Sequence, residues 1–370
     1  MRLSVKRISA VVLMMAASFL VAGLLGEILI RVTIKDQIVL FPRYHSDVDY
    51  GPYRIRRFRP NSSFTHTSID GEWRFDINNR GFRNDSDYEY EKPEATLRVL
   101  SLGDSHTAGY EVSQNATYSA VLEALLTDTG IDAEVLNTGI SGFGTAEQLV
   151  FLQNEGLRYA PDIVVVGFYA NDLQDNVKSG LYSLKDGRLH VEKTVHLPGV
   201  RIQNTLNNFA IIRWLSQNSY FFSFAFNAAY ELAKTILTNS AKEDAITEYA
   251  IPVGDFTDYE YSLAKALVAE ISRVCKENNI KLIIMDIPVP TDNYRIEPSI
   301  TDELATSFAQ NSDALIDSPS ALSSLMDRNL PAHVEHGHRH MSRHSHRLMA
   351  EAIAVEISEL LTIDETSKGP

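Results

Sequence analysis

The sequence predicts an α/β protein built on a three-layer, doubly wound parallel sheet of the flavodoxin-like kind. Apolar segments of strand length alternate with amphipathic segments of helix length along most of the chain, a rhythm typical of parallel sheets. One of these strands, residues 98–102, runs directly into a Gly-Asp-Ser turn. The chain has 370 residues, of which 44% are hydrophobic, enough for a substantial core.

The spacing of apolar residues gives the expected elements, with short apolar runs assigned as buried strands and longer amphipathic runs as helices. We expect strands at residues 98–102, 133–137, 162–168, 281–287 and 314–317, and helices at residues 115–128, 145–157, 259–278, 300–310 and 345–361.

The N-terminus contains a segment apolar enough to enter a membrane. Residues 8–26 carry no charged side chain and follow Arg2, Lys6 and Arg7. A helix of this length rises about 28 Å, close to the roughly 30 Å hydrocarbon core of a bilayer. Basic residues before the span predict a cytoplasmic N-terminus, with the rest of the chain in the periplasm or on the outer face of a bacterium. We expect residues 1–31 to be an uncleaved anchor, with cleavage after the small residues around Ala22 as the alternative.

We divide the remaining chain into a β-rich extension at residues 32–96 and a main domain at residues 97–370. In the extension, Asp70-Gly71 between two alternating runs predicts a hairpin. In the main domain, an insertion at about residues 175–256 interrupts the alternation and contains a strongly apolar, aromatic stretch. That stretch suits a helical cap over the active site, which we favour, or an amphipathic element resting on the membrane near the anchor.

The composition excludes several classes of function. The formal net charge of -14 would repel phosphate backbones, so we expect no binding to nucleic acid. The single cysteine, Cys275, excludes an internal disulfide and a cysteine-based metal site.

Residues able to carry chemistry follow three of the expected strands. Ser105 lies in the turn after the first strand, and the second strand leads into a glycine-rich segment that contains Gly142. Asn171 follows the third strand. Because open α/β sheets bind ligands at the carboxyl ends of their strands, these residues point to one site with a serine nucleophile and donors for developing negative charge.

These blocks resemble those of the SGNH, or GDSL-type, hydrolase family, over roughly residues 98–361 apart from the insertion. The resemblance implies an SGNH-type fold and ester hydrolysis or acyl transfer, with Ser105 as the nucleophile. It also implies an oxyanion hole made by the Ser105 and Gly142 amides and the Asn171 side chain. The apolar N-terminus and the segment Asp76-Ile-Asn-Asn-Arg-Gly-Phe-Arg resemble a membrane-anchored subgroup of this family.

The position of the base is less regular. The family places its base in an Asp-x-x-His or Asp-x-His motif shortly before a C-terminal helix, and here six histidines lie between His333 and His346. Counting back from the expected helix favours His340. The usual aspartate is absent, since Gly337 and His338 occupy the corresponding positions.

The acid partner of the base is therefore open. Glu335 is the nearest acid, and a Glu-x-x-His arrangement would make His338 the base instead. An acid from elsewhere, such as Asp317, or a backbone carbonyl would also orient the imidazole of His340.

The same histidines also allow a metal site. His336, His338 and His340 alternate, so an extended segment would place three imidazoles on one side, a set suited to Zn²⁺. Hydrolases of the family need no metal, and we expect neither a metal nor a cofactor.

We predict a serine esterase or deacylase anchored in the membrane. Its ester substrate would be an O-acylated glycan of the cell envelope, a lipid or a small ester. The alternatives are an O-acyltransferase of polysaccharide assembly and a catalytically inactive glycan-binding protein of the same fold.

Overall fold

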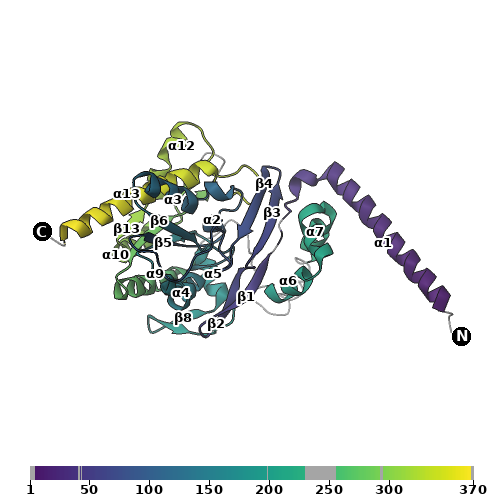
Figure 1. The fold of residues 1–370 in the computed structure, drawn as a ribbon, viewed down its shortest axis with the longest axis horizontal. Helices are drawn as coiled ribbons and strands as arrows, with labels where there is room; N and C mark the ends of the chain where they lie inside the picture. Colours follow the sequence, from purple (N-terminus) through teal and green to yellow (C-terminus); the bar gives the residue numbers. More distant parts are fainter. Residues whose placement is uncertain are drawn as a thin grey trace.

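The computed structural model describes residues 5–40, 42, 44–197, 199–229, 256–291 and 295–367. Most of these residues form one body around a central sheet (Figure 1). The long helix α1 (Val5–Thr33) projects from one side of this body, and α13 (Arg343–Ser367) ends on the opposite side.

The central sheet has five parallel strands in the order β13-β10-β7-β5-β6, which confirms the predicted parallel sheet. All six residues of β7 are buried, as expected for a strand with helices on both sides. The strands are β5 (Leu97–Leu102), β6 (Ala133–Asn137), β7 (Ile163–Phe168), β10 (Lys281–Asp286) and β13 (Ala314–Ile316).

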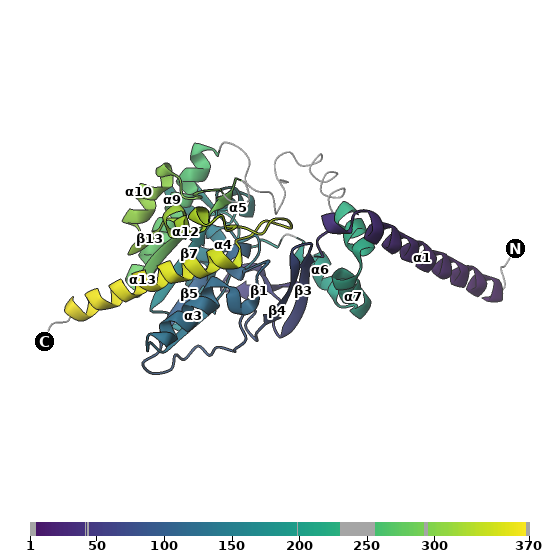
Figure 2. The same ribbon diagram turned by 90° about the horizontal axis from the view of Figure 1, so that it is seen from above.

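Helices cover both faces of this sheet (Figure 2). Side chains alternate along β5, so that Val99 packs on one face and Leu100 on the other. The first face is covered by α3 (Tyr118–Asp128) and α13, which also pack against each other. The second is covered by α4 (Thr145–Asn154), α5 (Asp172–Ser179), α9 (Asp258–Glu277) and α10 (Asp302–Gln310).

Short elements connect these layers. They are η1 (Lys35–Gln37), α2 (Ser105–Ala108), η2 (Gln114–Ala116), η3 (Gly156–Tyr159), β8 (Tyr182–Lys185), β9 (Arg188–Val191), β11 (Val289–Pro290), β12 (Ile296–Glu297), α11 (Ser318–Ala321) and α12 (Ser323–Asp327).

Two antiparallel hairpins lie between α1 and the sheet. They consist of β1 (His45–Tyr50) with β2 (Tyr53–Phe58), and β3 (Ser62–Ser68) with β4 (Gly71–Ile77). The second hairpin turns at Asp70-Gly71, as predicted. Its Phe64 and Phe75 rings stack with their centroids 4.7 Å apart, and both belong to the core shared with the sheet. The hairpins are therefore packed parts of the body.

The described part of the insertion begins with the end of α5 and the β8–β9 hairpin. It continues as three helices, α6 (Val200–Asn207), α7 (Ala210–Asn218) and one at residues 220–229. These helices do not cover the sheet. They lie on the outer side of the hairpins, beside α1, where α6 contacts β1 and α7 contacts β3 (Figures 1 and 2). The favoured cap over the active site is therefore not shown by the described residues, whose helices α6 and α7 lie beside α1. Residues 230–255 of the predicted insertion lie outside the described part of the chain.

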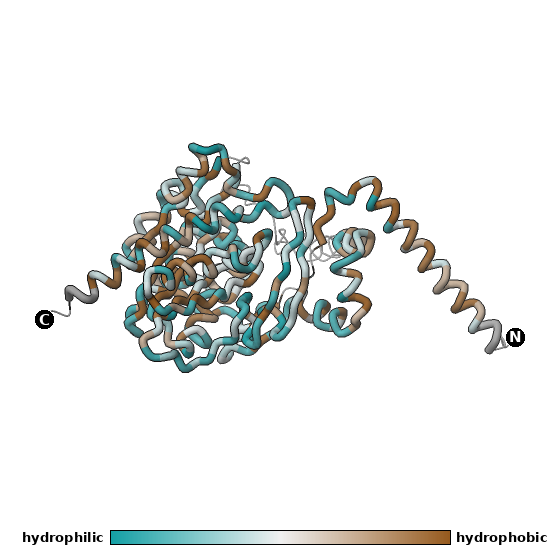
Figure 3. Tube along the Cα trace, turned by 45° about the horizontal axis from the view of Figure 1, so that its top comes forward, coloured by the Kyte–Doolittle hydropathy of each residue, from teal (hydrophilic) through white to brown (hydrophobic). Residues whose placement is uncertain are grey.

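Among the residues that the structure describes, one helix is long and apolar enough to cross a membrane. Its candidate span is Ser9–Thr33, and an 18-residue window of this span has a mean hydropathy of 2.2 with no buried residue. Figure 3 shows it as a continuous hydrophobic rod outside the body. By length and composition, a signal sequence has the same properties.

Two buried histidines are expected to make the fold sensitive to acid. His333 donates from Nε2 to the Pro288 carbonyl, and His346 accepts at Nδ1 from the Tyr118 amide. Burial lowers the pKa of His333 to about 4 and that of His346 to about 3. The unfolded chain therefore takes up protons first as the pH falls. Each histidine costs about 1.4 kcal/mol of stability per pH unit between roughly pH 6.5 and its folded pKa.

Denaturant unfolding between pH 7 and pH 4.5 measures this loss. We expect His346→Asn, which keeps an acceptor near the Tyr118 amide, to flatten the pH dependence of the free energy of unfolding. The exposed His190→Gln serves as the control and should leave the slope unchanged. Equal slopes in all three proteins would contradict the assignment.

Candidate active site

Ser105 stands at the carboxyl end of β5, which lies between β7 and the edge strand β6, and begins the short helix α2. Asp104 caps this helix, because its carboxylate accepts the His106 amide at 2.8 Å. Gly103 is required by the tight turn, since a Cβ there would lie 2.0 Å from the Thr107 hydroxyl. The turn holds the Ser105 side chain in one place at the edge of the sheet.

The structure brings His340 to Ser105. His340 lies in the loop before α13, and its Nε2 is 2.9 Å from Ser105 Oγ. The imidazole is almost completely buried. His338, the alternative base, packs its ring against His66 instead, with the centroids 5.6 Å apart. The imidazole in contact with the serine is thus the one that spacing to the C-terminal helix favoured.

The carboxylate at the other side of His340 belongs to Glu111, which the sequence analysis did not consider. Glu111 Oε2 lies 3.1 Å from His340 Nδ1. The acids named from the sequence lie elsewhere: Glu335 is exposed, and Asp317 caps α11 by accepting the Ser320 amide at 3.0 Å. The carboxylate that contacts His340 is therefore close to Ser105 in the sequence, whereas Glu335, an acid considered from the sequence, is close to His340.

The negative charge on Glu111 determines which nitrogen of His340 carries the proton. Burial alone would raise the pKa of Glu111, but hydrogen bonding to His340 and the nearby His66 ring outweigh burial and hold it well below its usual range. The ionised carboxylate orients the Nδ1–H of His340 toward itself. His340 Nε2 is then free to accept the proton of Ser105, an order of groups that suits nucleophilic attack on a carbonyl carbon.

The backbone around Glu111 is held in an uncommon conformation. Glu111 has a φ of +65°, in the left-handed region that side chains other than glycine rarely adopt. The buried Arg83 guanidinium stabilises this turn by donating to the carbonyls of Ala108 and Val112, each at 2.9 Å, and to that of Gly109. Burial lowers the pKa of Arg83 to about 9, so it stays charged at neutral pH. This arginine ends the Asp76 to Arg83 segment singled out in the sequence.

The β3–β4 hairpin forms one wall of the site. His66 of β3 is fully buried, with its Nε2 3.7 Å from Glu111 Oε1, and burial lowers the pKa of its imidazole. At the hairpin turn, Asp70 accepts both the amide and the ring Nδ1 of His336, at 3.0 and 2.9 Å. The extension therefore contacts both the acid and the loop that carries the base.

The three positions expected to form an oxyanion hole lie at neighbouring strand ends. Gly142 follows β6 and Asn171 follows β7, and these strands flank β5, which carries Ser105. The Asn171 amide nitrogen donates to Asp175 at 3.1 Å. This contact uses one of its two N–H groups and leaves the other for a ligand.

Among the described residues, one set of side chains has ligand atoms close enough to hold a metal. His66, Glu111 and His338 place such atoms within 4.8 Å of one another, a different set from the alternating histidines considered in the sequence. His336 is tied to Asp70, and His340 to Ser105. Both Glu111 oxygens already accept amide hydrogens, from His338 at 2.9 Å and His340 at 3.1 Å. Hydrogen bonds to Glu111 therefore explain why His66, Glu111 and His338 lie close together.

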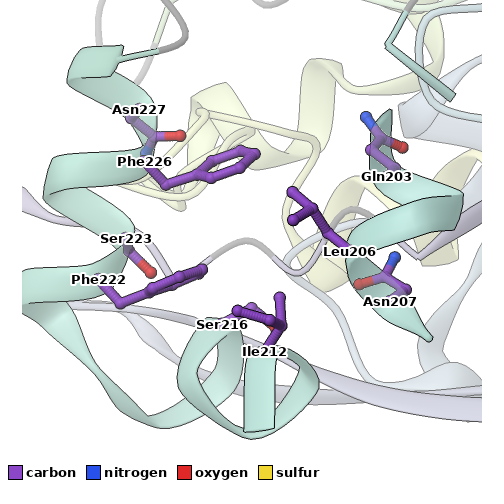
Figure 4. Close-up of a pocket in the computed structure, with 9 residues that line it drawn as sticks. All are labelled: Gln203, Leu206, Asn207, Ile212, Ser216, Phe222, Ser223, Phe226 and Asn227. Atoms are coloured by element: carbon purple, nitrogen blue, oxygen red, sulfur yellow. The ribbon is translucent and has the colours of Figure 1, made fainter. Parts of the chain in front are cut away.

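A groove in the insertion is separate from this site (Figure 4). It lies between α6, α7 and the helix at residues 220–229. It is lined by Gln203, Leu206, Asn207, Ile212, Ser216, Phe222, Ser223, Phe226 and Asn227.

Comparison with known proteins gives three findings. A model of the GDSL-like lipase/acylhydrolase family matches residues 101–304. An arylesterase of Vibrio mimicus is 34% identical over 79 residues, which are 21% of this chain and 40% of that protein, so the match spans less than half of the relative.

Solved structures with a similar course of the chain share little sequence. The esterase EstA from Pseudoalteromonas sp. is 14% identical with a TM-score of 0.40, and the alignment covers 72% of this chain and 98% of EstA. The acetylxylan esterase Axe2 from Geobacillus stearothermophilus is 15% identical with a TM-score of 0.38, and the alignment covers 70% and 94%.

The role of Glu111 is tested by removing its charge and keeping its shape. We expect Glu111→Gln to lower kcat for hydrolysis of p-nitrophenyl acetate by about 10²- to 10⁴-fold, because a neutral amide neither stabilises an imidazolium nor holds the required tautomer. The matched control Glu335→Gln should stay near the wild-type rate. Circular dichroism and thermal unfolding verify that both variants fold. A large loss in Glu335→Gln alongside a normal Glu111→Gln would disprove the role of Glu111.

Proposed function

Because this chain belongs to the GDSL-like lipase/acylhydrolase family and is an ester-cleaving hydrolase of that type, we propose that it works through Ser105, His340 and Glu111. The observation that carries this proposal is the continuous contact between them: 2.9 Å from Ser105 Oγ to His340 Nε2, and 3.1 Å from His340 Nδ1 to Glu111. The contact to Glu111 supports an active protein, because it supplies an acid partner for His340 in place of the missing aspartate.

In the proposed reaction, His340 Nε2 takes the proton of Ser105 as the serine oxygen attacks the ester carbonyl carbon. Glu111 stabilises the imidazolium that forms. The tetrahedral intermediate collapses, and its alkoxide leaves with the proton from His340, so that the acyl group remains on Ser105. Water, deprotonated by the same imidazole, then releases the acid and restores the serine. A sugar hydroxyl in place of water would make the same steps an acyl transfer.

Negative charge on the intermediate needs donors that are in place beforehand. We assign this role to the amides of Ser105 and Gly142 and to the side chain of Asn171. Their positions at the ends of three adjacent strands support the assignment. Asp175 is a positioning residue, since its hydrogen bond orients the Asn171 amide.

We place the enzyme at a membrane, with residues 1–31 as the anchor and residues 32–96 as an extension of a hydrolase domain at residues 97–370. The exposed, apolar α1 supports the anchor, and Arg2, Lys6 and Arg7 support a catalytic body in the periplasm. For this location we propose an O-acylated glycan of the cell envelope as the substrate class. A lipid or a small ester is the competing substrate.

The nucleophile is tested by labelling with a fluorophosphonate. Ser105→Ala should abolish labelling and lower ester hydrolysis by several orders of magnitude, with little change in thermal stability. His340→Ala should lower the rate of ester hydrolysis nearly as much, because nucleophile and base act as one unit. His338→Ala should lower that rate less. Labelling that persists in Ser105→Ala would place the nucleophile elsewhere.

Topology is tested with reporter fusions after Pro370. A reporter active only in the periplasm should be active, and a reporter active only in the cytoplasm should be silent. Exchange of Arg2, Lys6 and Arg7 for glutamate should weaken this orientation. The reverse reporter pattern in the wild-type chain would contradict the periplasmic location, and a soluble, shortened product would show that the segment is a cleaved signal.

A further inference from the structure

The insertion carries apolar side chains on the side that faces away from the body. In α7 no residue is buried, and the flanking Phe209 is 58% exposed. Ile211 and Trp214 of α7 are exposed to 59% and 57%. Phe221 and Phe224, in the next helix, are exposed to 37% and 45%. Exposed apolar surface of this extent marks a contact with another phase or partner.

The polar side chains of the same helices form hydrogen bonds with the hairpins. Gln217 of α7 accepts the Thr65 amide of β3 at 3.0 Å. Asn204 of α6 donates to Asp47 of β1 at 2.9 Å. The insertion therefore rests on the hairpins with polar groups and leaves its apolar residues outside, the reverse of a helix that packs into a core.

The insertion contacts α1 near its C-terminal end, between Gly26 and Arg31. The Glu27 carboxylate of α1 accepts the Ser219 hydroxyl at 2.7 Å and the Phe221 amide at 2.9 Å. One turn further along, Arg31 donates to the Asn218 carbonyl at 2.9 Å. The Phe221 ring also packs so closely on Gly26 that a Cβ there would lie 2.7 Å from it.

These contacts lie where the uncharged part of α1 ends. Residues 8–26 carry no charge, and Glu27 is the first charged residue after them. In the proposed anchor, the hydrocarbon core would therefore end near Gly26, and the insertion would be held in the layer of lipid headgroups next to it. Tryptophan and phenylalanine side chains are favoured in that layer.

We propose that α7 and the turn after it lie in the interface of the same bilayer that α1 crosses, with Phe209, Ile211 and Trp214 among the lipids. The proposal rests on the membrane anchor proposed above. The occupant is the lipid bilayer and not a second protein, because the exposed Phe221 of the insertion packs on Gly26, the last residue of the uncharged part of α1. Two attachments to one membrane hold the body at a set orientation, with the hairpins between the insertion and α2 (Figures 1 and 2).

The chain has two tryptophans, which makes the proposal measurable. The full-length Trp73→Phe variant retains only Trp214, and Trp214→Phe retains only Trp73, which lies in the β3–β4 hairpin. Both are reconstituted into phosphatidylcholine vesicles with and without brominated acyl chains. We expect brominated lipid to reduce Trp214 emission by roughly half or more and to leave Trp73 emission unchanged. Vesicle flotation shows whether the chain is in the membrane.

Each result has a distinct meaning. Trp214 that is quenched by aqueous iodide and not by brominated lipid, in protein that floats with the vesicles, would overturn the interfacial position and leave the anchor intact. Trp214 shielded from both quenchers would show that protein covers α7, which also overturns the proposal. Protein that does not float would refute the anchor and this inference together, while hydrolysis by Ser105 would be unaffected.

Discussion

An ionised carboxylate is costly to bury unless hydrogen-bond donors surround it, and the Glu111 carboxylate imposes this requirement on the whole site. Its donors are the amides of His338 and His340 and the His340 ring. The loop must curl around the carboxylate to supply them, and Gly337 has no room for a side chain, since a Cβ would lie 1.9 Å from Glu111 Oε1. The same contacts that satisfy the buried charge direct His340 toward Ser105.

The N-terminal extension is part of this arrangement. Arg83 holds the turn that carries Glu111, and Asp70 holds His336 at the start of the histidine loop. His66 lies against the second oxygen of Glu111. Three distant parts of the chain thus meet around one carboxylate, so changes in the hairpin are expected to alter the site even though Ser105 and His340 lie outside the hairpin.

The sheet was predictable because its strands are buried on both faces and read as continuous apolar runs. Parallel topology then placed Ser105, Gly142 and Asn171 at one edge, and spacing to α13 favoured His340. Glu111 was not predictable, because its position depends on a left-handed backbone conformation and on the buried Arg83, which no local pattern announces. The insertion was ambiguous for another reason: its apolar side suits either a site or a bilayer, and the sequence does not reveal its contacts with Glu27 and Arg31.

The most direct test is an experimental structure of the protein after reaction with a fluorophosphonate. We expect phosphorus bonded to Ser105 Oγ and a phosphoryl oxygen within hydrogen-bond distance of the Gly142 amide and the Asn171 side chain. His340 should still lie between the adduct and Glu111. A phosphonylated Ser105 with His340 hydrogen-bonded to Glu335, or a phosphoryl oxygen directed away from both Gly142 and Asn171, would contradict this expectation.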